Sequence, residues 1–149
     1  MVLTINSYTQ ERKEFTDYKT AFLNPDSVKI LSINCLHNNS LNTDGCDSIP
    51  ENIYRFKNLE ELYIIETNIN KIPSTISRLK NLKILNIRYN HLLNYEKELC
   101  NLTNLDKLEY LDISWASLEY LPHCLTNLKS IESLNLGFND IQDITYLIS

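Results

Sequence analysis

The chain has 149 residues, of which 19 are acidic and 14 basic, so its formal net charge is −5. This balance argues against a nucleic-acid-binding protein, which needs a basic surface for the phosphates, and no apolar run reaches the roughly 18 residues of a membrane span. Leucine and isoleucine together supply 41 residues and glycine only 2, which indicates one domain with a large aliphatic core.

Residues 1–27 are predicted to form an N-terminal helical cap. Phe15, Tyr18 and Phe22 are spaced to share one face of a helix, and Pro25 is expected to end it. The start of the chain lacks the basic segment followed by an apolar segment that marks a signal peptide. We therefore expect a cytoplasmic protein, with a secreted protein as the alternative.

Residues 28–149 contain five copies of one pattern, which start at residues 28, 59, 82, 108 and 131. The second copy reads LEELYIIETNINKIPSTISRLKN, with apolar residues at positions 1, 4, 6, 11, 14, 18 and 21. Positions 4 and 6 alternate as in a short strand, and positions 14, 18 and 21 fit one face of a helical turn. The first copy carries an insertion near residues 36–46, and the third is three residues longer, so we expect a longer helix within 94–107.

This pattern resembles the leucine-rich repeat family in its 23-residue LxxLxLxxNxLxxIPxxIxxLxN form. The resemblance implies an α/β solenoid: a right-handed coil with a short parallel sheet on the concave face and helical or 3-10 segments on the convex face. Pro50, Pro73 and Pro122 would start the helical segments. The family's asparagine at position 9 bonds neighbouring loops. Ala116 stands there in the fourth copy, so a water or a shifted loop is expected to satisfy those groups.

The four cysteines, Cys35, Cys46, Cys100 and Cys124, show neither CxxC spacing nor a histidine at ligand spacing, so no metal site is expected. Cys100 and Cys124 would lie on adjacent coils, where a disulfide is an option, but we expect unpaired thiols. His123 adjoins Cys124 without forming a nucleophile–base pair, and two glycines cannot build a phosphate loop. The sequence therefore predicts neither an enzyme nor a cofactor.

Positions 3, 5, 7 and 8 of each copy are predicted to face outward on the concave side. At position 8, Tyr89, Trp115 and Phe138 would form one aromatic column because neighbouring strands lie about 4.8 Å apart. The alternative interpretation is that these rings only cover the turn after the strand. The predicted partner-binding residues are Tyr63, Glu66, Arg88, Tyr89, Tyr110, Asp112, Trp115 and Phe138.

We interpret the chain as a protein–protein interaction module whose concave face binds a protein partner with basic groups around an apolar centre. One alternative is a regulatory or targeting domain of a larger enzyme. Another is a secreted effector or adhesin that binds host proteins. The strand near Leu134 and Leu136 is expected to be an open sheet edge, which suggests either a homodimer through this end or a missing capping segment.

Overall fold

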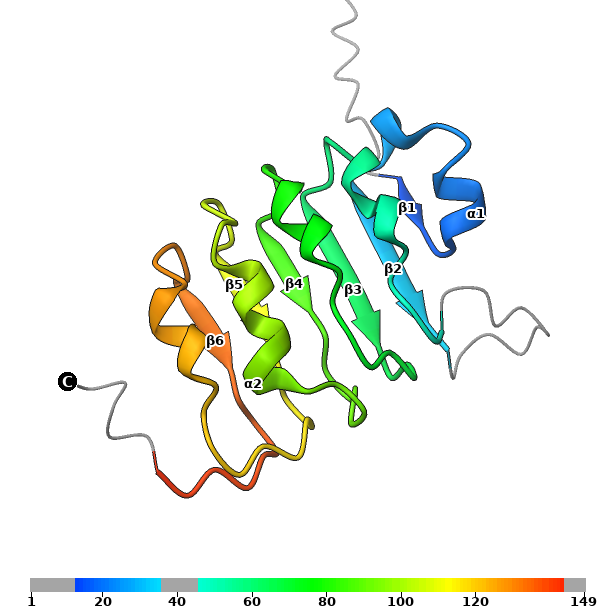
Figure 1. Cartoon of the computed structure of the whole chain (residues 1–149). Coiled ribbons are helices and arrows are strands. Elements are labelled where there is room, and N and C mark those ends of the chain that lie inside the picture. Colours follow the sequence, from blue (N-terminus) through cyan, green and yellow to red (C-terminus); the bar gives the residue numbers. More distant parts are fainter. Residues whose placement is uncertain (1–12, 36–45, 144–149) are drawn as a thin grey trace, which may run out of the picture.

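A computed structural model describes residues 13–35 and 46–143, so most of the insertion in the first repeat lies outside the described residues. Six parallel strands form one sheet in chain order, and Figure 1 shows them side by side. The strands are β1 (Glu14–Phe15), β2 (Ile30–Asn34), β3 (Glu61–Ile65), β4 (Ile84–Asn86), β5 (Tyr110–Asp112) and β6 (Ser133–Asn135).

Short helical segments return the chain from one strand to the next and cover one face of the sheet (Figure 1). They are α1 (Tyr18–Ala21), η1 (Pro25–Ser27), η2 (Glu51–Arg55), η3 (Ser74–Arg78), α2 (Tyr95–Glu98), η4 (Leu99–Leu102) and η5 (His123–Asn127), where η denotes a 3-10 helix. Pro50, Pro73 and Pro122 immediately precede η2, η3 and η5. The predicted role of these prolines at helix starts is confirmed.

The predicted repeat phase is confirmed by the sheet register. Leu85, Leu111 and Leu134 are directly paired across β4, β5 and β6, and the first two have no exposed surface. Leu134 and Leu136 are half-buried, because among the described residues β6 pairs with β5 alone. The predicted dimer through this edge stays a prediction.

The N-terminal segment differs from the predicted helical cap. Phe15 lies in β1, which pairs with β2, whereas Tyr18 lies in the four-residue helix α1. Pro25 starts η1 instead of ending a longer helix. The physical reason is that the first strand of a solenoid has free backbone groups at its edge, which another strand can satisfy and a helix cannot.

The third repeat contains the longer helical segment that its three additional residues predict, as α2 continues directly into η4. The same segment also supplies a hydrogen-bond donor in place of the asparagine that is missing at position 116. Asn90 and Asn139 each donate from Nδ2 to a carbonyl of the preceding repeat, Ile64 O and Ile113 O. Ala116 has no such donor. The carbonyl that an asparagine at position 116 would reach is Ile87 O, which accepts instead from the buried Tyr95 hydroxyl at 2.9 Å. Tyr95 therefore supplies one donor of the missing asparagine, where a water or a shifted loop was expected.

The expectation of unpaired thiols was wrong. Cys35 pairs with Cys46, and Cys100 pairs with Cys124, with Cα–Cα distances of 5.8 and 5.1 Å. The second pair can form because, once the longer third repeat is allowed for, the two residues lie within one repeat position of each other on adjacent coils. None of the helices in the described part of the chain has the length and apolar character needed to cross a membrane.

Candidate functional site

The aromatic column predicted at position 8 is a ladder of three stacked rings, which we call the aromatic ladder. The ring centroids of Tyr89 and Trp115 lie 4.9 Å apart, and those of Trp115 and Phe138 lie 4.1 Å apart, with interplanar angles of 14° and 15°. The spacing of parallel strands, about 4.8 Å, brings equivalent side chains close to the stacking distance of aromatic rings. Phe138 is 73% exposed and Trp115 is 38% exposed, so the ladder opens towards its C-terminal end.

A left-handed backbone turn projects each ladder ring outward from the end of its strand. Position 8 has a φ between 55° and 58° in four successive repeats, at Glu66, Tyr89, Trp115 and Phe138. A residue with a β-carbon is strained there by roughly 1–2 kcal/mol, so the turn does not favour aromatic residues. Glu66 adopts the same turn without a ring. The aromatic side chains at the other three positions are therefore not required by the backbone.

Beside the ladder, a buried carboxylate organises the middle of the sheet face. Asp112 is only 3% exposed. Its Oδ1 accepts from the Ser114 backbone N–H and hydroxyl at 2.9 and 2.6 Å. Its Oδ2 accepts from the Tyr110 hydroxyl at 3.2 Å and from the side-chain amides of Asn86 and Asn135 at 3.4 and 3.1 Å. Because its oxygens are already occupied, Asp112 holds the face in shape and is not available to a partner, contrary to its predicted role.

Tyr63 is tied to its own strand in a similar way. Its hydroxyl donates to Glu61 Oε2 at 2.9 Å, and the side chain is half-buried. Burial, followed by this hydrogen bond to Glu61, raises the pKa of Tyr63 to about 12. Burial and the charge of Asp112 likewise raise the pKa of the Tyr110 phenol above its ordinary value. Both phenols therefore stay neutral at physiological pH and act as donors within the face.

The charged residues of the predicted set lie next to the ladder. Arg88 is exposed and directly precedes the ladder residue Tyr89, while Glu66 takes the ladder position one repeat earlier and is half-buried. Glu60, immediately before β3, faces two lysines, Lys83 at 3.4 Å and Lys29 at 4.0 Å. Lysines on neighbouring coils therefore compensate the negative charge of Glu60 beside this face.

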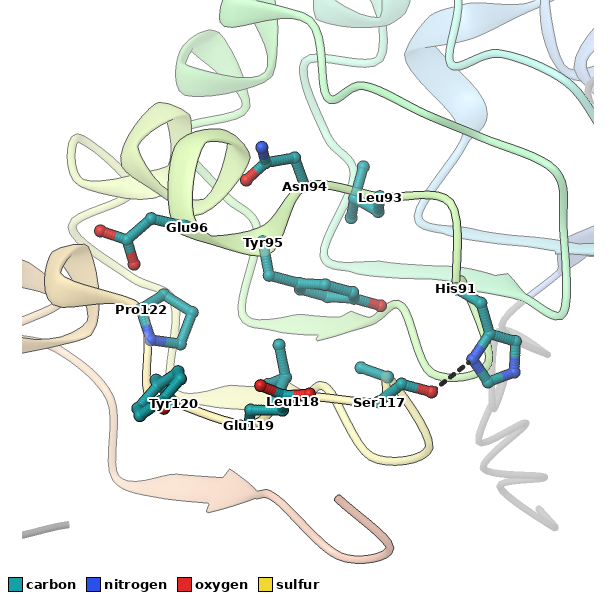
Figure 2. A pocket seen from close by; sticks show the side chains of 11 residues that line it. His91, Leu93, Asn94, Tyr95, Glu96, Ser117, Leu118, Glu119, Tyr120 and Pro122 are labelled. Atoms are coloured by element: carbon teal, nitrogen blue, oxygen red, sulfur yellow. Dashed lines mark hydrogen bonds between the residues drawn. The ribbon is translucent and has the colours of Figure 1, made fainter. Parts of the chain in front are cut away.

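A groove of about 420 Å³ lies away from the ladder, between loops of the third and fourth repeats, and sequence reasoning did not predict it. Figure 2 shows Tyr95 at its centre and Tyr120 at one end. The Tyr95 hydroxyl is bonded to Ile87 O, and His91 Nδ1 lies 3.1 Å from the Ser117 hydroxyl. The polar groups of Tyr95, His91 and Ser117 in this groove therefore already bond within the protein.

The fold and this site define a class of protein: a stacked-coil solenoid whose parallel sheet presents a face with exposed side chains. A sequence model described as a leucine-rich repeat region matches residues 28–147. The chain belongs to the leucine-rich repeat family. No match is found among curated proteins.

Solved structures with the same fold come from plants and bacteria. The plant peptide hormone receptor RGFR1, in complex with RGF2, is 26% identical, with a TM-score of 0.55 over 81% of this chain and 18% of that chain. A leucine-rich repeat protein of Leptospira interrogans is 22% identical, with a TM-score of 0.53 over 85% of this chain and 36% of that one. Internalin C2 of Listeria monocytogenes is 19% identical, with a TM-score of 0.57 over 83% and 57%. The chain therefore spans between about a fifth and three fifths of these proteins.

Proposed function

We propose that the protein is an interaction module that binds a protein or peptide partner on the concave face, through the aromatic ladder. The single observation that supports this most strongly is the ladder itself. Three aromatic rings stand at a turn position that Glu66 shows does not require them, and the last ring is 73% exposed. Exposed aromatic and arginine side chains are the residue types that contribute most to protein interfaces.

The contact set that we propose is narrower than the set predicted from sequence. Asp112 is buried, and Tyr63 and Tyr110 are half-buried with hydroxyls bonded to neighbouring carboxylates. The remaining contacts are Arg88, Glu66 and the three rings of the aromatic ladder. A partner would place an apolar side chain against the open end of the ladder and a basic group near Glu66.

A plant receptor of the same fold is 26% identical to this chain and was solved in complex with RGF2, which supports the choice of a peptide as the first probe. The test is a selection of peptides from a random display library on the immobilised full chain. The tightest peptide is then measured against Arg88→Glu and Lys129→Glu, two charge reversals of which only the first lies on the concave face. We expect Arg88→Glu to change affinity at least tenfold, with a smaller effect at high salt. Equal effects of the two variants would contradict the proposal.

One observation favours the secreted effector over the cytoplasmic protein that the sequence predicts. All four cysteines are paired, and disulfides persist in oxidising compartments. A secreted module of this kind would use the same concave face. Trapping of free thiols in the protein as isolated from its source would separate the two, because a cytoplasmic chain would carry reduced cysteines.

A further inference from the structure

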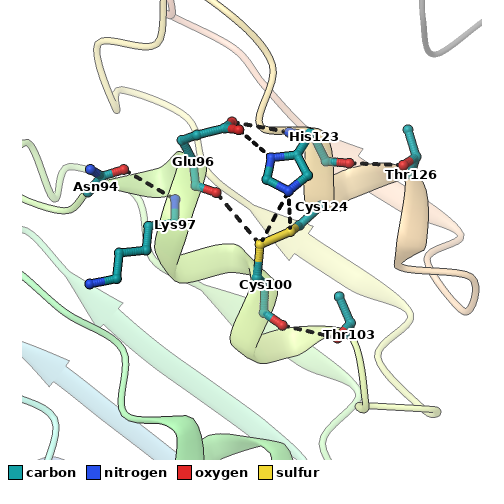
Figure 3. Close-up of a disulfide and its surroundings, with 8 residues drawn as sticks. All are labelled: Asn94, Glu96, Lys97, Cys100, Thr103, His123, Cys124 and Thr126. Atoms are coloured by element: carbon teal, nitrogen blue, oxygen red, sulfur yellow. Dashed lines mark hydrogen bonds and ion pairs between the residues drawn. A yellow bond between two sulfur atoms is a disulfide. The ribbon is translucent and has the colours of Figure 1, made fainter.

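Four side chains gather where α2 and η4 meet η5, among the helical segments that cover the sheet. Figure 3 shows the disulfide between Cys100 and Cys124, with the His123 ring beside both sulfur atoms. His123 Nε2 lies 3.3 Å from Cys124 Sγ and 3.8 Å from Cys100 Sγ. These three potential ligand atoms all lie within 4.8 Å of one another. No step of the proposed partner binding uses them.

Glu96 fixes the orientation of the histidine. One carboxylate oxygen contacts His123 Nδ1, and the other accepts the His123 backbone N–H at 3.2 Å. A carboxylate at Nδ1 keeps the ring proton on that nitrogen, which leaves the lone pair on Nε2. Nε2 is the atom that faces the sulfurs (Figure 3). A histidine that is oriented by a carboxylate on one side and offers its other nitrogen is the usual arrangement of a metal ligand.

We propose that, in the dithiol form, the Cys100 and Cys124 thiolates and His123 Nε2 bind one zinc ion. Two thiolates and one imidazole are donors that zinc prefers. Tetrahedral zinc, with bonds of about 2.3 Å to sulfur and 2.0–2.1 Å to nitrogen, separates a sulfur from a nitrogen ligand by about 3.6 Å. The observed separations of 3.3 and 3.8 Å lie on either side of that value. Only the two sulfur atoms would have to move apart, and water would take the fourth position.

Metal loading begins with reduction of the disulfide. A phosphine breaks the disulfide, takes up the oxygen of one water molecule to become the phosphine oxide, and leaves two thiols. Zinc then displaces one proton from each thiol, so two protons are released for each ion bound. His123 keeps its Nδ1 proton, which it donates to Glu96, and contributes none. In the oxidising compartment that the paired cysteines favour, the two thiols appear only after such a reduction, whereas in a reducing compartment they are present without added phosphine.

The test uses the full chain with Cys35→Ser and Cys46→Ser, so that phosphine reduces only the proposed pair. Co²⁺ serves as the coloured probe, and Zn²⁺ is measured by its displacement. We expect one metal ion per chain, thiolate-to-cobalt charge-transfer absorption and two protons released. The same protein in its disulfide form is the control and should bind no cobalt. If the double serine variant does not fold, the wild-type chain is compared with a Cys100→Ser, Cys124→Ser variant, and the difference in metal content gives the answer.

Single substitutions then assign the ligands. His123→Gln and Glu96→Gln should each weaken zinc binding by about 10- to 100-fold. Lys97→Gln, a neighbouring exposed position on the same helix, should leave it unchanged. Reduced protein that binds no cobalt would overturn the proposal. Binding that survives His123→Gln unweakened, or that persists without Cys100 and Cys124, would overturn it equally.

Discussion

Replacing Trp115 with alanine tests whether the aromatic ladder is part of the fold as well as a surface. From the repeat pattern alone, in which position 8 faces outward, we would expect removal of the Trp115 side chain to leave the stability of the protein unchanged. In the structure, however, the Trp115 ring is stacked on both faces, by Tyr89 at 4.9 Å and by Phe138 at 4.1 Å. It is only 38% exposed, so more than half of its surface is covered. We therefore expect Trp115→Ala to destabilise the protein.

The size of the loss follows from this coverage. Truncating a fully buried tryptophan to alanine costs about 3–5 kcal/mol, so a ring with more than half of its surface covered should cost about 2–3 kcal/mol. Of this loss in stability, about 0.5–1.5 kcal/mol for each stacked pair comes from the contact between the Trp115 ring and the neighbouring ring. Alanine has the same strain at a φ of 55°, so the backbone contributes little to the difference. For a chain of this length, Tm should fall by roughly 5–10 °C.

Urea unfolding followed by circular dichroism is the suitable assay, because Trp115 is the only tryptophan and the variant loses its fluorescence signal. Trp115→Phe keeps a ring in the stack and should cost less than about 1 kcal/mol. A double-mutant cycle with Phe138→Ala should show coupling of about 0.5–1.5 kcal/mol. A loss below about 0.5 kcal/mol for Trp115→Ala, together with no coupling, would refute the reasoning.

Three further substitutions probe the core and the face. Leu111→Ala should cost about 2–5 kcal/mol in urea unfolding because Leu111 is fully buried between equivalent leucines, and an unchanged midpoint would show that the repeat phase is wrong. Tyr95→Phe should cost about 1 kcal/mol in the same assay, since the backbone carbonyl of the missing-asparagine site loses one donor. Burial raises the pKa of Tyr63 to about 12, so its neutral form stabilises the fold below pH 10, and that stability is lost as the pH rises through 12. Wild type should therefore lose more stability than Tyr63→Phe between pH 9 and pH 11.5, and equal losses would argue against a shifted phenol.

The repeat phase could be predicted because burial in a stacked coil depends on spacing alone. Leu85 and Leu111 occupy the same position in two copies, and the register pairs them. The structure of the N-terminal segment could not be predicted in this way. The i, i+3, i+7 spacing that includes Phe15 is typical of a helix, but it does not show that β2 has a free edge, with which β1 pairs. The role of Tyr95 also depends on a contact across the coil, to Ile87 O, that a linear pattern does not contain.

The aromatic ladder could be predicted from the sequence because its three rings share one repeat position. The burial of Asp112 could not, since it results from donors on three strands, among them Asn86 and Asn135. The placement of Cys100 and Cys124 on adjacent coils could likewise be predicted. The orientation of the His123 ring towards their sulfur atoms could not, because it depends on a contact with Glu96, which lies 27 residues earlier in the chain.

The most direct test of concave-face binding compares two exposed aromatic residues on different surfaces. Phe138, at the open end of the aromatic ladder, is 73% exposed. Tyr120, which lines the groove between loops of the third and fourth repeats, is 65% exposed. Each is changed to alanine, and the affinity for the peptide selected on the wild-type chain is measured by titration calorimetry. We expect Phe138→Ala to weaken binding by about 30-fold, which corresponds to the 2 kcal/mol of an interface hot spot, and Tyr120→Ala to change it less than about twofold. Equal effects of the two variants, or a larger effect at Tyr120, would contradict binding through the aromatic ladder.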